Sequence, residues 1–143
     1  MELISTSPEE TKNIAKNFAK KLKPGSLLAL FGYLGSGKTT FIQGLATGFG
    51  IKKRVLSPTF IFIRSYQLKN KGSFTSFHHI DLYRIEKPQE LKSLGLEEFI
   101  NDKNSITAIE WADKLKKLPK KSVKIRFKII DNERRKIEIK WPQ

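Results

Sequence analysis

Residues 27–40, which read LLALFGYLGSGKTT, decide the fold. Residues 27–31 form a continuous apolar run of strand length, as expected for a parallel strand that is covered on both sides. Residues 32–39 match the pattern G-x-x-x-x-G-K-T of a phosphate-binding loop. Phe41, Ile42, Leu45 and Phe49 then recur at helical spacing, and Gly50 stands where such a helix would end. A strand, a loop and a helix in this order direct a helix N-terminus at bound phosphate, so the sequence predicts a nucleotide site.

Each fixed position of this loop has a chemical role. Glycines allow the backbone amides to approach phosphate oxygens closely. The ammonium of Lys38 can contact the β- and γ-phosphates of ATP, and the hydroxyl of Thr39 can bind Mg²⁺. We therefore expect the nucleotide to be held by Gly35, Ser36, Gly37, Lys38, Thr39 and Thr40.

The remaining pattern predicts one α/β domain over residues 1–143. Ser7 caps a first helix whose apolar stripe runs to Leu22. We expect an extended segment at 55–59, strands at 60–66, 76–82 and 106–109, a turn at 69–73, and short helices at 88–94 and 96–100. Alternation of apolar and basic residues over 124–141 predicts a hairpin that turns at Asp131 and Asn132. The expected fold is P-loop NTPase-like: a mostly parallel sheet layered by helices, with antiparallel edge strands and a C-terminal hairpin.

Composition restricts the class of protein. The chain has no cysteine, no long apolar run and no leader-like segment, which predicts a cytoplasmic enzyme without a membrane span. Its formal charge is +14, with 22 Lys and 6 Arg, and residues 114–140 hold 12 basic against 3 acidic residues. This basic tail is either a solvated sheet face or a contact for RNA or an acidic protein. Its outward positions lack the aromatic residues on which bases stack.

Two carboxylates follow apolar or extended segments and could serve a metal ion. Asp81 lies near the end of the segment 76–82, and Glu110 follows the apolar run 106–109. One could bind Mg²⁺ while the other orients a water molecule. His78 and His79 are adjacent, so on a strand they point to opposite faces and cannot share a metal. Arg64 and Arg84 could neutralise phosphate charge, but a surface position is the simpler interpretation.

Four motifs in one order resemble the TsaE family of small bacterial ATPases. They are residues 32–40, then Ser57-Pro58-Thr59-Phe60, then His79-Ile80-Asp81-Leu82-Tyr83-Arg84, and then Ile109-Glu110-Trp111. The resemblance covers residues 7–141. The sequence differs from the family pattern at Tyr33, where an acidic residue is usual, and at Ser36, where alanine is common.

This resemblance implies a function in the synthesis of threonylcarbamoyladenosine in tRNA. The chain would bind and hydrolyse ATP with Mg²⁺ as a partner of TsaB-like and TsaD-like proteins. Thr39 and Glu110 would contact Mg²⁺, Asp81 would be a second acid near the metal, and Ser57-Pro58-Thr59 would form a switch near the γ-phosphate. The adenine would lie near Thr6, with Arg134 close by.

Three other functions compete with this one. A free-standing small-molecule kinase would need an acceptor pocket and a mobile lid, and no lid-like insertion is visible. A GTPase would carry the segments N/T-K-x-D and D-x-x-G, which this chain lacks. A nucleic-acid binder without catalytic activity would bind tRNA in a salt-dependent manner without hydrolysing ATP.

Overall fold

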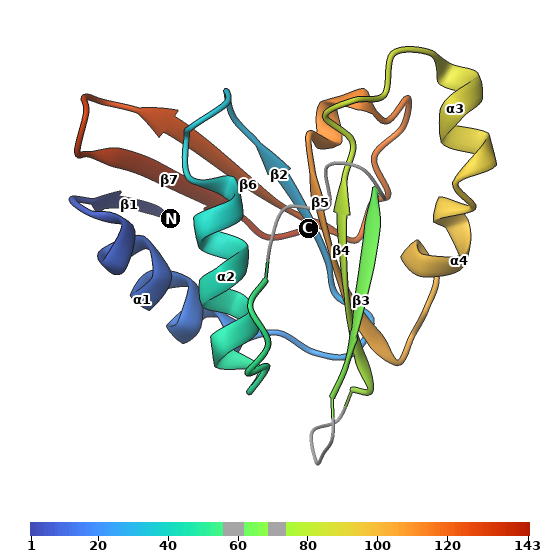
Figure 1. Cartoon of the computed structure of the whole chain (residues 1–143), viewed down its shortest axis with the longest axis horizontal. Coiled ribbons are helices and arrows are strands. Elements are labelled where there is room, and N and C mark those ends of the chain that lie inside the picture. The colour runs from blue at the N-terminus through green and yellow to red at the C-terminus, as the bar shows by residue number, and fades with distance from the viewer. Residues whose placement is uncertain (56–61, 69–73) are drawn as a thin grey trace.

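The chain forms one seven-stranded sheet in the order β1-β7-β6-β2-β5-β4-β3 (Figure 1). The computed structural model describes residues 1–55, 62–68 and 74–143. Four central strands are parallel to one another: β6 (Ser122–Ile129), β2 (Leu27–Phe31), β5 (Ser105–Glu110) and β4 (Ser76–Asp81). The strands β3 (Ile63–Gln67), β7 (Arg135–Lys140) and β1 (Glu2–Ser5) pair antiparallel at the two edges. The predicted α/β fold with antiparallel edges and a C-terminal hairpin is therefore confirmed.

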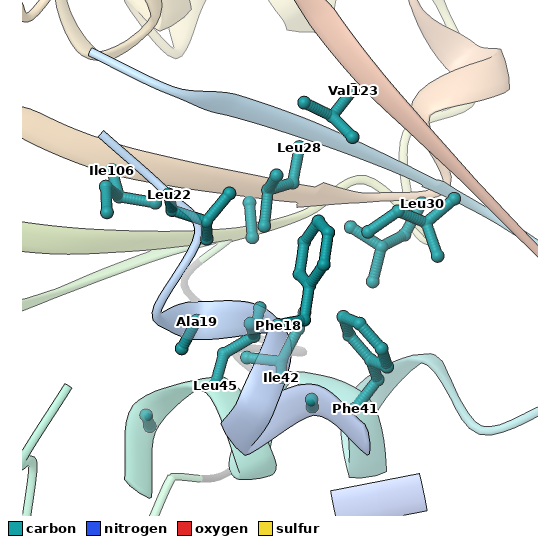
Figure 2. Close-up of a cluster of buried hydrophobic side chains, with 14 of the residues drawn as sticks. Phe18, Ala19, Leu22, Leu28, Leu30, Phe41, Ile42, Leu45, Ile106 and Val123 are labelled. Carbon is teal, nitrogen blue, oxygen red and sulfur yellow. The ribbon is translucent and has the colours of Figure 1, made fainter. Parts of the chain in front are cut away.

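Two helices cover one face of the sheet. They are α1 (Pro8–Ala19) and α2 (Lys38–Gly48), and their apolar side chains meet those of the strands in the larger core (Figure 2). Ser7 caps α1 as predicted, since its hydroxyl accepts from the amide of Glu10 at 3.1 Å. The helix ends at Ala19, earlier than the stripe suggested, although Leu22 stays buried in the turn that follows.

Among the described residues, the opposite face is covered over β2, β5 and β4 and at Ile63 of β3. There α3 (Pro88–Ser93), α4 (Leu96–Ile100) and the short 3₁₀ turn η1 (Ala112–Lys114) lie over a second core around Leu27, Ile80 and Ile109. Figure 1 shows α3 and α4 at the end of the molecule that carries β3. Every residue of β4 and β5 is buried, as is typical of strands enclosed by helices on both sides.

The C-terminal hairpin alternates as its sequence predicted. Ile125 and Phe127 of β6 and Ile137 and Ile139 of β7 are buried, whereas the lysines and arginine between the β6 positions are exposed. Ile129 lies beyond the core and is exposed.

Sequence reasoning missed or misplaced other segments. The strand β1 was not predicted. The strand expected at 60–66 is described as β3 from Ile63 to Gln67, and residues 60 and 61 lie outside the described residues. Most of the expected extended segment 55–59 and the turn 69–73 lie outside the described residues. Within the described part, no helix has the length and apolar character to cross a membrane.

Candidate functional site

The phosphate-binding loop joins the end of β2 to the start of α2. Gly37 occupies the N-cap with a positive φ of 106°, and it has no side chain with which to cap the helix. Gly32 lies so close to its neighbours that a Cβ there would stand 2.5 Å from Ser36 Oγ and 2.9 Å from the carbonyl oxygen of Phe127. The loop therefore leaves the first amides of α2 available to an anion and requires glycine for its shape.

Lys38 lies buried at the centre of this loop. Its Nζ donates to the carbonyl oxygens of Gly32 and of Tyr33, the latter at 3.0 Å, and lies 4.3 Å from the ring centroid of Trp111. Burial lowers the pKa of Lys38 below its usual value, although the carboxylates of Glu110, Asp81 and Asp113 act in the opposite direction. The ammonium thus contacts loop carbonyls, which a phosphate group could replace.

Glu110 joins this loop to the centre of the sheet. Strand pairing places it beside Leu30 of β2 and Asp81 of β4, because the carboxyl ends of these parallel strands lie at the same edge. Thr39 Oγ1 donates to Glu110 Oε1 at 2.9 Å, with Oε2 at 3.2 Å. The hydroxyl and the carboxylate that sequence reasoning assigned to one site are therefore in contact.

His79 contacts Glu110 from the other side. Its Nε2 lies 2.6 Å from Glu110 Oε2, and the two side chains are 0% and 3% exposed. His78 points to the opposite face of the sheet, as predicted, where its Nδ1 lies 2.7 Å from Ser65 Oγ and its Nε2 3.3 Å from Asp102 Oδ2. The contact with Glu110 was not predicted, because the chain separation of 31 residues gives no local signal.

Asp81 lies buried at the carboxyl end of β4. Its Oδ1 accepts from the backbone amide of Tyr83 at 3.0 Å, which fixes one side of the carboxylate. It lines the same cavity as Glu110.

A cavity of about 740 Å³ lies over the loop and these two acids. Of the residues predicted to bind nucleotide or metal, eight line it: Thr6, Gly35, Gly37, Lys38, Thr39, Thr40, Asp81 and Glu110. Ser36 instead has a buried hydroxyl without a hydrogen-bonding partner among the described residues. Thr59 lies outside the described residues.

The predicted arginine is not among the residues that line the cavity. Arg134 bonds Asp131 within the β6–β7 turn at 2.8 Å, whereas its neighbour Arg135 lines the cavity. The guanidinium of Arg135 donates to the carbonyl oxygen of Gly35 at 3.2 and 3.3 Å. Trp111 is a second lining residue that was missed. Arg64 and Arg84 are both exposed.

The donor set at Thr39 and Glu110 suits a hard cation. Mg²⁺ prefers oxygen ligands and is usually bound by one or two protein side chains together with phosphates and water. In the described part of the chain, no three His, Cys, Asp or Glu side chains are grouped to hold a metal. A threonine hydroxyl beside one carboxylate fits a site that a nucleotide completes, and it does not fit a metal site formed by protein alone.

Comparisons with known proteins agree with this arrangement. The family model described as "Threonylcarbamoyl adenosine biosynthesis protein TsaE" matches residues 5–137. The protein named "tRNA threonylcarbamoyladenosine biosynthesis protein TsaE" from Bacillus subtilis is 41% identical over 134 residues, covering 93% of this chain and 80% of that protein. The protein of the same name from Rickettsia bellii is 39% identical over 136 residues, covering 94% and 90%.

A solved structure supports the same relationship. The crystal structure of YdiB from Bacillus subtilis superimposes with a TM-score of 0.81 at 34% identity, covering 100% of this chain and 86% of that chain. Likeness in sequence and in structure therefore extends over nearly the whole chain. The chain belongs to the TsaE family, whose members are named for threonylcarbamoyladenosine biosynthesis in tRNA.

Proposed function

We propose that this chain is a Mg²⁺-dependent ATPase required for threonylcarbamoyladenosine modification of tRNA. The observation that carries the proposal is the convergence of Lys38, Thr39, Glu110 and Asp81 on one cavity at the carboxyl edge of β2, β5 and β4. This is the set of groups that phosphoryl transfer to water requires: a cation for the phosphates, ligands for a metal and a carboxylate for the nucleophile.

The loop supplies most of the binding energy in this proposal. Amides of residues 35–40 would contact the β- and γ-phosphates, and Lys38 would exchange its loop carbonyls for phosphate oxygens. Thr39 and Glu110 would hold Mg²⁺, which neutralises charge on the phosphates. Thr6 at one wall and the β6–β7 turn at the other would border the nucleoside, with Arg135 nearer to the cavity than the predicted Arg134.

Asp81 would orient the attacking water. The hydrogen bond from the amide of Tyr83 orients this carboxylate, which lines the cavity beside Glu110. Water forms a bond to the γ-phosphorus as the bond to the bridging β–γ oxygen breaks, which yields ADP, inorganic phosphate and a proton. Ser57-Pro58-Thr59, including the predicted catalytic Thr59, would respond to the γ-phosphate as a switch.

We further propose that TsaB-like and TsaD-like proteins are the partners, in the cytoplasm. The isolated chain would hydrolyse ATP slowly, since a switch subunit completes its active state on a partner. Family membership and the small size of the chain support this proposal over a free-standing kinase.

The deciding experiment measures threonylcarbamoyladenosine in tRNA over many turnovers, with the cognate TsaB and TsaD, with and without this chain. We expect repeated turnover only when the chain and ATP are present. Equal turnover without the chain would contradict the proposal. Transfer of the γ-phosphate to a small acceptor without partner proteins would favour the kinase.

A further inference from the structure

We propose that His79 is a positioning residue that holds the carboxylate of Glu110 toward Thr39. As a metal ligand Glu110 would be a carboxylate, which only accepts hydrogen bonds, so His79 Nε2 would be the donor in the contact of 2.6 Å. Thr39 donates to the same carboxylate at 2.9 Å. The hydrogen-bonded series His79–Glu110–Thr39 therefore runs from β4 through β5 to the first turn of α2. The inference rests on the proposed metal-binding role of Glu110.

The position of His79 is one that an apolar side chain would ordinarily fill. His79 is fully buried on the face of the sheet that α1 and α2 cover, where neighbouring strand positions hold apolar residues. Its Nδ1 is buried and has no hydrogen-bonding partner among the described residues. An unsatisfied buried polar atom destabilises the folded state. An apolar side chain would avoid that cost, so the bond to Glu110 is what the imidazole contributes.

Thr39 and His79, which both donate to Glu110, do not have equivalent roles. The Thr39 hydroxyl belongs to the phosphate-binding loop, and its oxygen would be shared with the cation. His79 contacts Glu110 from the neighbouring strand β4, so it would hold the carboxylate both with and without the metal. Groups that orient metal ligands in this way change metal affinity by about tenfold to a hundredfold when they are removed.

The test compares substitutions at the two adjacent histidines. His79→Leu removes the donor at similar volume, and His79→Gln places an amide N–H near the position of Nε2. His78→Leu is the matched control, because it removes a buried imidazole from the same strand on the opposite face. The measurements are the affinity for a fluorescent ATP analogue with Mg²⁺ and with EDTA, together with the thermal midpoint of each variant.

We expect His79→Leu to reduce the gain in affinity that Mg²⁺ gives by about tenfold or more, with the affinity in EDTA unchanged. His79→Gln should recover most of that gain, and His78→Leu should change only the thermal midpoint. An undiminished gain in His79→Leu would overturn the proposal. If His79→Leu does not fold, failure of His79→Gln to keep the gain in a folded protein would overturn it as well. Absence of nucleotide binding in the wild type would instead refute the proposed function.

The second core leaves one face of the C-terminal hairpin uncovered. We define the basic sheet face as Lys124, Arg126, Lys128, Lys136 and Lys140. Because side chains alternate along a strand, these side chains lie on the sheet face opposite to the buried residues of β6 and β7. No described residue of β1, β6 or β7 belongs to the second core. The face also carries Glu2 and Glu138, which pair with Lys136 at 3.2 Å and Lys140 at 3.7 Å.

Strand register places like charges directly opposite one another on this face. Lys124 is the partner of Lys140, and Lys128 is the partner of Lys136. Like charges at such positions destabilise a sheet. The two acids leave a positive excess, so a polyanion that spans both pairs would relieve the repulsion.

Aromatic groups border the basic sheet face, although its own strands place none there. Tyr33 of the phosphate-binding loop is 84% exposed and lines a groove of about 680 Å³ with Arg126 and Lys128. The guanidinium of Arg126 lies 4.6 Å from the ring centroid of Phe31 in the same groove. Cations beside an exposed aromatic ring are the combination that binds single-stranded nucleic acid.

From this surface we infer that the basic sheet face binds the phosphates of an RNA chain, with a base against Tyr33. An RNA partner fits the proposed function in tRNA modification, on which the inference rests. The groove shares Gly32 and Tyr33 with the phosphate-binding loop, so RNA and nucleotide would meet at the two sides of one loop.

Fluorescence anisotropy with unmodified tRNA tests this inference. The variant Lys124→Glu/Lys128→Glu reverses two charges of the basic sheet face. The control Lys20→Glu/Lys23→Glu reverses two exposed charges near the end of α1, so both variants have the same net charge. Affinity for the fluorescent ATP analogue, measured in parallel, reports on the nucleotide site.

We expect the face variant to weaken tRNA binding at least tenfold and to reduce the salt slope by about two, one for each lost phosphate contact. The control should change affinity less than threefold, and nucleotide affinity should stay constant in both. Equal losses in the two variants would show a general charge effect and overturn the inference. Loss of binding to TsaB and TsaD with unchanged tRNA affinity would overturn it in favour of a protein partner.

Discussion

The two halves of the sheet use charge in opposite ways. In the half formed by β2, β5 and β4, the strands are buried, and the polar side chains at their ends bond to one another, as Glu110 does to Thr39 and His79. In the half formed by β6, β7 and β1, charged side chains alternate with the core and point to water. A buried polar group without a partner costs free energy, whereas an exposed one is solvated by water. Single residues are therefore informative in the first half, and only their pattern is informative in the second.

Lys38→Ala should have the largest effect on nucleotide binding. Losing a charge-assisted contact with phosphate costs about 2–4 kcal/mol, so calorimetry should detect little or no ATP binding. Lys128→Ala, which removes a lysine from the exposed half, should bind ATP normally. Equal ATP affinity in Lys38→Ala and the wild type would refute the assignment of the loop.

Substitutions of Glu110 and Asp81 should differ in effect from each other and from a substitution of Glu138 in the exposed half. Glu110→Ala should lower Mg²⁺-dependent ATP affinity about tenfold to a hundredfold, because it removes the carboxylate that contacts Thr39. Asp81→Ala should reduce hydrolysis more than binding, and Glu138→Ala should change neither. Titration of ATP at several Mg²⁺ concentrations, combined with phosphate release, separates these effects. Normal binding and hydrolysis in Glu110→Ala would mean that Glu110 is not the metal ligand.

The contrast between the halves also explains what the sequence could predict. The loop, the buried strands and the hairpin follow local patterns, so they were found from residue spacing alone. Glu110 and Asp81 were found because both end strands that run in parallel. The bonds of His79 and Arg135 join residues 31 and 100 positions apart, and no local pattern encodes such a pair. The strand β1 has only four residues and depends on its pairing with β7, so its own sequence gives a weak signal.

Gly44→Ala tests whether the two halves unfold as one unit. Gly44 lies where α2 touches α1, and a Cβ there would stand 2.4 Å from the carbonyl oxygen of Lys12 and 2.7 Å from the Cβ of Ala15. Alanine favours a helix by about 1 kcal/mol over glycine, but overpacking costs about 1–3 kcal/mol, and here the nearest atom belongs to the backbone. We expect a net loss of stability in one cooperative urea transition.

The matched control for this substitution is Gln89→Ala, at an exposed position of α3. It should change the free energy of unfolding by no more than about 0.5 kcal/mol. Two separate transitions in Gly44→Ala, seen by tryptophan fluorescence and by circular dichroism, would show that the halves unfold independently. Increased stability would show that the helices move apart without loss.

The smallest effect is expected at the tip of the exposed half. Asp131 accepts hydrogen bonds from the backbone amide and the guanidinium of Arg134 and from the amide of Glu133, and these bonds lower its pKa from 3.8 to about 2. Because the folded pKa lies below the unfolded value, Asp131 contributes its stabilisation above pH 3.8 and loses it as the pH falls through about 2. Asp131→Asn should remove only this part of the acid dependence. The carboxyl carbon shift of Asp131, followed by NMR between pH 1.5 and 6, measures the pKa directly. Titration of the folded chain near 3.8 would mean that the turn does not hold the carboxylate in solution, and that this charge, unlike those of the buried half, has no fixed partner.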